Sequence, residues 1–172
     1  MSVPEPSKLR IERSEGDLVE VTARRGRGRD VIYAGRARDL HLPSFGAATW
    51  SDTYVAACTR PERWWILAPV RPPNESAARI AGLLGTGAIV VDQSSGYVVF
   101  DLVGAGWRVL LTRGCRLDLD PGVFAPGHAA ATTLAQVQVV MIPHPSGILV
   151  LAPSTYAQHF REWLEHLAKA HP

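Results

Sequence analysis

Cysteine is scarce in this sequence, and long apolar runs are missing. The two cysteines, Cys58 and Cys115, form no Cys-x-x-Cys pair, and for a cytoplasmic protein reduced thiols are the expected state. No stretch approaches the 18 apolar residues of a membrane helix, and residues 1–17 lack the apolar centre of a signal peptide. We therefore expect a cytoplasmic protein that is not inserted in a membrane.

Charge of one sign is not in excess either. The net charge is +2, which is too small to predict nucleic acid as the main partner. Lysine is rare, because Lys8 and Lys169 are the only two among 18 basic residues, and this arginine bias with abundant Ala, Gly and Pro is typical of bacterial proteins. At 47% hydrophobic and 20% charged residues, the 172-residue chain is expected to fold around a sizeable core.

The hydrophobic pattern predicts an α+β fold with mainly antiparallel sheets. We expect a partly flexible N-terminal segment at residues 1–45, containing one strand and a basic loop, and one domain at residues 46–172. Two hairpins are predicted, because residues 53–58 and 64–68 flank a proline-containing turn and residues 133–142 and 147–153 flank Pro-His-Pro-Ser. Two further strands are expected at residues 88–94 and 96–104. Hairpins that alternate with single helices favour the α+β class.

Three helices are expected between and after these strands. The first would be capped by Asn74 and end at Gly85 or Gly87, with an apolar face on one side. The second, residues 105–113, would end at a left-handed Gly114. The third follows Ser154 and carries an apolar stripe at helical spacing. The apolar residues assigned to the first and third helices are Ala77, Ile80, Ala81 and Leu84, then Tyr156, Phe160, Trp163, Leu164 and Leu167.

Catalytic and metal-binding signatures are weak. The six histidines show no ligand spacing, and His128 and His144 are interpreted as exposed loop residues. Cys115 follows an expected helix end, where carbonyl groups disfavour a thiolate, so it is interpreted as a small buried residue in a bend. The sequence contains no nucleophile elbow, dinucleotide fingerprint or P-loop. Asp92, at a strand end, either has a functional role or caps a turn, which is the commoner situation.

Two features favour contact with a protein partner. One is the basic loop with Arg24, Arg25, Arg27 and Arg29, which would bind phosphate or an acidic partner surface, or else be a solvated loop. The other is Trp50, which lies in a connection rich in Gly, Ala and Ser, because Trp and Arg are enriched at interface hot spots. Trp50 would equally suit a local core, since large aromatic side chains also dominate core energetics.

Residues from about 50 to 170 resemble the gamma subunit of bacterial heterotetrameric sarcosine oxidase. The resemblance rests on a Gly-Cys-x-Leu-Asp-Leu turn with the loop and strand that follow, a Pro-x-x-Trp strand, an Asp-x-Ser strand pair, and a final Phe-x-x-Trp-Leu helix. The matching residues are Gly114, Cys115, Leu117, Asp118, Leu119, Phe124, Gly127, Thr132 and Thr133; Pro61, Trp64 and Leu67; Asp92, Ser94, Leu102, Gly104 and Leu110; and Phe160, Trp163 and Leu164.

This resemblance implies a fold like the folate-binding domain of the glycine-cleavage aminomethyltransferases. It also implies alpha, beta and delta partner subunits that hold FAD, FMN, NAD, tetrahydrofolate and zinc, with no cofactor in this chain. The expected function is therefore that of a noncatalytic subunit, acting in assembly and stability, of a heteromeric flavin-dependent oxidase or dehydrogenase of sarcosine or another N-methylated amine. The alternative is a stand-alone folate-binding, one-carbon-transfer protein, for which Asp92 or Asp101 with Tyr97 or Trp107 are the candidate pterin contacts.

Overall fold

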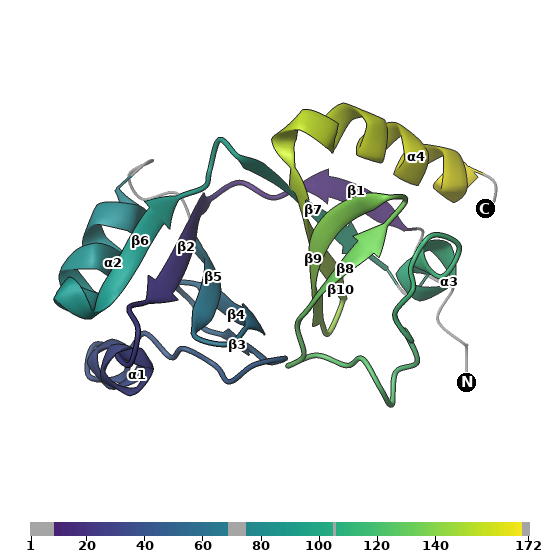
Figure 1. Ribbon diagram of the computed structural model, residues 1–172. Helices are drawn as coiled ribbons and strands as arrows, with labels where there is room; N and C mark the ends of the chain where they lie inside the picture. Colours follow the sequence, from purple (N-terminus) through teal and green to yellow (C-terminus); the bar gives the residue numbers. More distant parts are fainter. Residues whose placement is uncertain (1–8, 69–74, 105, 170–172) are drawn as a thin grey trace. The chain divides into compact units, whose positions relative to one another are not determined.

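The computed structural model describes residues 9–68, 75–104 and 106–169, and these fold into two compact units. Unit 1 comprises residues up to 14 together with 96–126 and 131–172, and unit 2 comprises 15–95 with 127–130. Each unit contains one five-stranded antiparallel sheet and its own helices, so the α+β prediction is confirmed (Figure 1). The units divide the chain at residues 14 and 95, whereas the sequence predicts a boundary at residue 46.

Unit 2 is built on the sheet β3-β4-β5-β2-β6. Its strands are β2 (Asp17–Ala23), β3 (Ala48–Trp50), β4 (Val55–Arg60), β5 (Arg63–Ala68) and β6 (Ala88–Asp92). Its helices are α1 (Gly28–Arg36), α2 (Ser76–Leu84) and the 3-10 turn η1 (Gly85–Gly87). The predicted β4–β5 hairpin is confirmed, because Ala56 pairs with Ile66 and Cys58 with Trp64. The turn is shorter than predicted, since Pro61 and Glu62 alone separate the strands.

Helix α2 also follows its sequence signals. Ile80 and Leu84 are buried, and Gly85 ends the helix with a φ of 64°, a left-handed value that favours glycine. Ala81 is exposed, because the buried stripe repeats every four residues and Ala81 falls beside it. The predicted cap, Asn74, lies outside the described residues, and the residue that precedes the first turn is Glu75.

The arginine-rich segment is a loop only as far as residue 27, and helix α1 follows where the sequence predicts that the loop continues. Arg24 and Arg25 follow β2, Arg27 is the residue before α1 and forms no side-chain capping bond, and Arg29 lies within the first turn of that helix. Helix α1 escapes sequence patterning because only Val31 and two glycines of its nine residues are buried. A Cβ at position 28 would overlap the carboxylate of Glu62, an exposed side chain that would have to move aside.

Unit 1 is built on the sheet β1-β7-β10-β9-β8. Its strands are β1 (Arg10–Arg13), β7 (Tyr97–Val103), β8 (Ala130–Leu134), β9 (Val137–His144) and β10 (Gly147–Pro153). Its helices are α3 (Trp107–Leu111), the 3-10 turn η2 (Ser154–Tyr156) and α4 (Ala157–Lys169), which lies along the sheet (Figure 1). The predicted β9–β10 hairpin is confirmed, with Ile148 opposite Pro143.

The single strand expected at residues 133–142 is in fact two strands. Ala135 and Gln136 interrupt it with φ values of 49° and 66°, which separates β8 from β9. Turns of this kind usually carry Gly or Asn at such positions, and neither residue is present to indicate the break.

Gly114 does not adopt the left-handed conformation predicted for it, and α3 ends at Thr112 with helical dihedrals. Glycine is needed there for a different reason. A Cβ at this position would lie 2.7 Å from Cζ2 of Trp163, so the missing side chain makes room for an indole of α4. The stripe predicted for α4 holds for Phe160 and Leu164, both 0% exposed, whereas Tyr156 is exposed because it belongs to η2.

Candidate functional site

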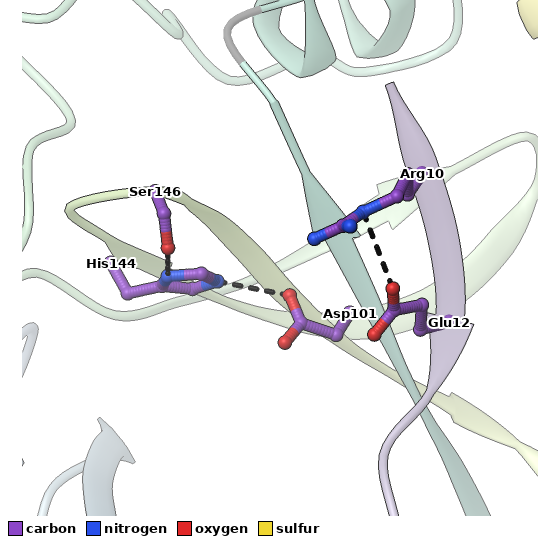
Figure 2. A network of polar contacts seen from close by, with 5 residues as sticks. All are labelled: Arg10, Glu12, Asp101, His144 and Ser146. Atoms are coloured by element: carbon purple, nitrogen blue, oxygen red, sulfur yellow. Dashed lines mark hydrogen bonds and ion pairs between the residues drawn. The ribbon is translucent and has the colours of Figure 1, made fainter. Parts of the chain in front are cut away.

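A chain of polar contacts links an acid, an imidazole and a hydroxyl in unit 1 (Figure 2). Asp101 Oδ1 lies 3.0 Å from His144 Nε2, and His144 Nδ1 lies 3.1 Å from Ser146 Oγ. A carboxylate only accepts hydrogen bonds, so the Nε2 atom must carry a proton and donate to Asp101. Nδ1 is then able to accept from the Ser146 hydroxyl, which lies exposed in the β9–β10 turn.

The strand register brings these residues together although 43 positions separate Asp101 from His144. Asp101 lies on β7 and His144 on β9, with β10 between them. Gly147 of β10 is the residue paired with both His144 and Val103, so no side chain at that position separates the imidazole from the β7 face. His144 is therefore a strand residue with an 11% exposed side chain, which corrects the prediction of an exposed loop histidine.

We expect Gly147→Ala to destabilise the protein by about 1–3 kcal/mol, because a Cβ there would overlap the Leu102 carbonyl oxygen and the backbone must shift. Urea unfolding of the variant measures this loss. The control is Gly82→Ala on α2, where a Cβ meets no atom within 4 Å and a gain of about 0.5–1 kcal/mol is expected. A Gly147→Ala variant as stable as the parent would show that β10 relaxes without cost.

A second acid lies beside Asp101. Glu12 of β1 is directly opposite Asp101 in the register, and like charges in such positions repel. Each carboxylate has its own cationic or hydrogen-bonding partner: Arg10 Nε lies 3.4 Å from Glu12 Oε1, and His144 contacts Asp101 (Figure 2). The repulsion between the two carboxylates is therefore offset by partners that lie on strands of the same sheet.

A pocket of about 440 Å³ adjoins this network. It is bounded by the end of β7, the β9–β10 turn and the start of α3; the lining residues are Val103, Gly104, Trp107, Arg108, Pro126, His144, Pro145, Ser146 and Gly147. Such a volume falls within the range of small-molecule sites. Asp101 supports the imidazole from behind without lining the pocket.

The folate candidates are engaged within the fold. Asp92, in unit 2, accepts a 2.8 Å bond from the Ser94 backbone N–H, which is the turn-capping alternative. Trp107 is only 4% exposed, and the guanidinium carbon of Arg108 lies 4.2 Å from the centre of its ring. Tyr97 is four residues from Asp101 on β7, or about 13 Å along the strand. Trp107 thus lines the unit 1 pocket and Asp101 lies behind the imidazole that lines it, whereas Asp92 belongs to unit 2.

The candidate partner residues lie on the surface of unit 2. Trp50 is 42% exposed on β3, the edge strand of its sheet, and Arg24, Arg25, Arg27 and Arg29 are exposed around the start of α1. Arg27 Nε forms an ion pair of 2.9 Å with Asp30. The exposure of all five residues is compatible with contact to another protein.

The cysteines are structural in character. Burial raises the pKa of the Cys58 thiol above its ordinary value, although backbone hydrogen bonds from the β4–β5 turn oppose this shift. Cys115 is half-buried; its backbone bridges Leu134, and its Sγ lies 3.9 Å from Met141 Sδ. Its packing in a bend agrees with the sequence interpretation, but its burial is incomplete.

Sequence reasoning named Asp101 and Trp107 but missed Arg108, His144 and Ser146. One signal was available: Asp101 interrupts the apolar strand Tyr97–Val103, and an acid in such a strand needs a partner. Among the residues that the structure describes, no three His, Cys, Asp or Glu side chains cluster as metal ligands. None of the described helices is long and apolar enough to cross a membrane.

Comparison with known proteins gives one family and a shared fold. The model of the "Sarcosine oxidase, gamma subunit family" matches residues 29–170. A heterotetrameric sarcosine oxidase from Corynebacterium sp. U-96, solved with pyrrole 2-carboxylate, contains a chain 20% identical to this one with a TM-score of 0.82; the match covers 94% of this chain and 84% of that chain.

A second solved structure, the glycine cleavage system aminomethyltransferase T from Bartonella henselae, is 14% identical with a TM-score of 0.65. The match covers 92% of this chain but only 46% of that longer chain. The predicted likeness in fold to the aminomethyltransferases is thereby confirmed. No curated protein matches the sequence.

Proposed function

We propose, from the premise that this chain belongs to the sarcosine oxidase, gamma subunit family, that it is a noncatalytic subunit of a heteromeric flavin-dependent oxidase or dehydrogenase. The substrate of the complex would be sarcosine or another N-methylated amine. The role of the chain would lie in assembly and stability. The observation that carries the proposal is the family match, which extends through both compact units.

The side-chain contacts support a structural role over folate binding. A pterin site needs an aromatic face for stacking and a carboxylate that hydrogen-bonds to the pterin ring. Here Arg108 already lies over the Trp107 ring, and His144 is already hydrogen-bonded to the Asp101 carboxylate. Both groups already serve contacts within the fold. Folate binding would have to break these contacts and would therefore lose part of its binding energy.

The proposed partners are alpha, beta and delta subunits, which would hold FAD, FMN, NAD, tetrahydrofolate and zinc. This chain would carry none of these groups. We place the complex in the cytoplasm, in keeping with free thiols at Cys58 and Cys115. Trp50 and the arginines around the start of α1 are the proposed contacts.

Co-expression with the alpha, beta and delta chains tests the proposal. We expect the chain to elute with them in size-exclusion chromatography, and omission of the chain to reduce the yield or thermal stability of the complex. Flavin content per assembled complex should stay constant, since this chain would hold no flavin. If the other subunits assemble and turn over normally without it, the subunit role is wrong. Tetrahydrofolate titration of the isolated chain would then test the folate alternative.

Replacement of Trp50 tests the proposed contact surface. We expect Trp50→Ala to weaken association about thirtyfold, because loss of a hot-spot anchor commonly costs about 2 kcal/mol. Surface plasmon resonance against the other subunits measures this change. Tyr156→Ala is the control, since this aromatic residue is also exposed, at 53%, but lies in unit 1. Equal affinities for Trp50→Ala and the parent would remove Trp50 from the interface.

A further inference from the structure

Arg108 is held in a fixed position at the wall of the unit 1 pocket. Its Nη1 donates to the carbonyl oxygens of Leu119 and Phe124, the second at 2.9 Å, and its guanidinium lies over the Trp107 ring. These three contacts orient the planar guanidinium before any ligand arrives. A preorganised group loses little conformational entropy on binding.

The charge of Arg108 has no anionic counterpart among the described residues. Arg108 takes no part in the ion pairs that join Arg10 to Glu12, Arg27 to Asp30, Arg63 to Glu20 and His144 to Asp101. Arg108 is half-buried, and a cation removed from water is normally compensated by a nearby anion. Its contacts to two carbonyls and a ring face supply only partial negative charge.

The rest of the pocket suits a small polar anion. Ser146 and His144 line the same pocket as Arg108. The acids Asp101 and Glu12 are not among the lining residues. Pro126, Pro145 and Val103 provide apolar surface for a short carbon skeleton. The volume of about 440 Å³ accommodates a small organic acid.

We propose that this pocket binds a carboxylate, with the Arg108 guanidinium as the principal contact and the Ser146 hydroxyl as a second donor, which turns from His144 Nδ1 to the ligand. The planar fork of arginine matches the two oxygens of a carboxylate, which a lysine ammonium would not. The carboxylate belongs either to a free small acid or to an Asp or Glu side chain of a partner subunit. The inference does not depend on the proposed subunit role, because it concerns the isolated chain.

The test is a titration of the isolated full-length chain with sodium acetate, followed by ¹H–¹⁵N NMR. The probes are the Arg108 Nε–H and the Trp107 indole N–H, since the two groups lie against each other. We expect saturable shifts in the millimolar range with acetate and none with sodium chloride at equal ionic strength. Absence of saturation with acetate, or equal shifts with chloride, would overturn the proposal.

Two variants separate the roles of the residues. Arg108→Gln should weaken acetate binding at least tenfold, whereas Arg161→Gln, an exposed arginine on α4, should leave it unchanged. Ser146→Ala keeps the carbonyl contacts of Arg108 and should weaken binding about two- to tenfold, the value of one hydrogen bond. If Arg108→Gln fails to fold, Ser146→Ala alone tests whether the pocket binds acetate. Acetate binding that survives both changes would exclude the site.

The assembled complex distinguishes the two sources of the carboxylate. If a partner side chain fills the pocket, the acetate-dependent shifts of Arg108 disappear when the partner subunits bind. If a free acid is the ligand, the shifts persist in the complex. Acetate binding by the isolated chain is tested separately from assembly. A failure to assemble would therefore contradict the proposed subunit role but not the carboxylate site.

Discussion

Trp64→Ala is expected to lower the free energy of unfolding by about 3–5 kcal/mol, as large-to-small changes of buried aromatic residues do. Trp64 is 1% exposed in the centre of the unit 2 core. It pairs across the sheet with Val21 on β2 and Cys58 on β4, and its indole Nε1 donates a 2.8 Å bond to the Pro43 carbonyl. Alanine would leave both a cavity and an unsatisfied carbonyl.

Urea unfolding monitored by far-UV circular dichroism measures this effect. Trp64→Phe is the informative control, because it removes the donor to Pro43 while it keeps most of the apolar volume. Trp64→Phe should lose less stability than Trp64→Ala, because phenylalanine fills most of the cavity that alanine would leave. A Trp64→Ala loss below about 1 kcal/mol would mean that the core collapses around the vacancy, outside the usual range for such changes.

Phe160→Ala should cost unit 1 about 3–5 kcal/mol for a similar reason. Phe160 is 0% exposed, and its ring centre lies 5.4 Å from that of Phe100 on β7 and 5.7 Å from that of Trp163. The side chain therefore joins α4 to the sheet. Its loss removes two aromatic contacts in addition to the buried area.

The same helical region provides the control for this prediction. Tyr156→Ala should change stability by less than about 0.5 kcal/mol, because surface substitutions usually fall within that range and this ring is 53% exposed. Thermal unfolding of both variants gives the comparison. Similar losses at positions 156 and 160 would contradict the packing of α4 on the sheet.

Local signals in the sequence predicted those elements whose ends are marked by glycine or proline. The β4–β5 turn contains Pro61, and α2 ends at Gly85, so both were found. Helix α1 was missed because its glycines resemble loop residues, although Gly28 and Gly35 are buried at close contacts. The β8–β9 turn was missed because Ala135 and Gln136 have no turn preference.

The candidate site was predicted only in part because its contacts are non-local. Asp101 was named as a candidate pterin contact, but its partner His144 depends on the order β7-β10-β9. That order places Gly147 between the two strands that carry Asp101 and His144, and no local pattern encodes it. Arg108 was hidden for the same reason, since its acceptors are the carbonyls of Leu119 and Phe124, in the loop that follows α3.

The strand order of unit 1 also bears on how the chain folds as a ribosome makes it. Strand β10 lies at the middle of that sheet, yet it is synthesised after every other strand of the described residues, long after the edge strand β1. Unit 2 has nearly all of its residues once Ser95 is made. At about 5–20 residues per second, synthesis of the segment from Ser95 to Pro153, the end of β10, takes roughly 3–12 s. During that interval β1 and β7 expose strand edges, and these nascent strands are where chaperone protection would matter most.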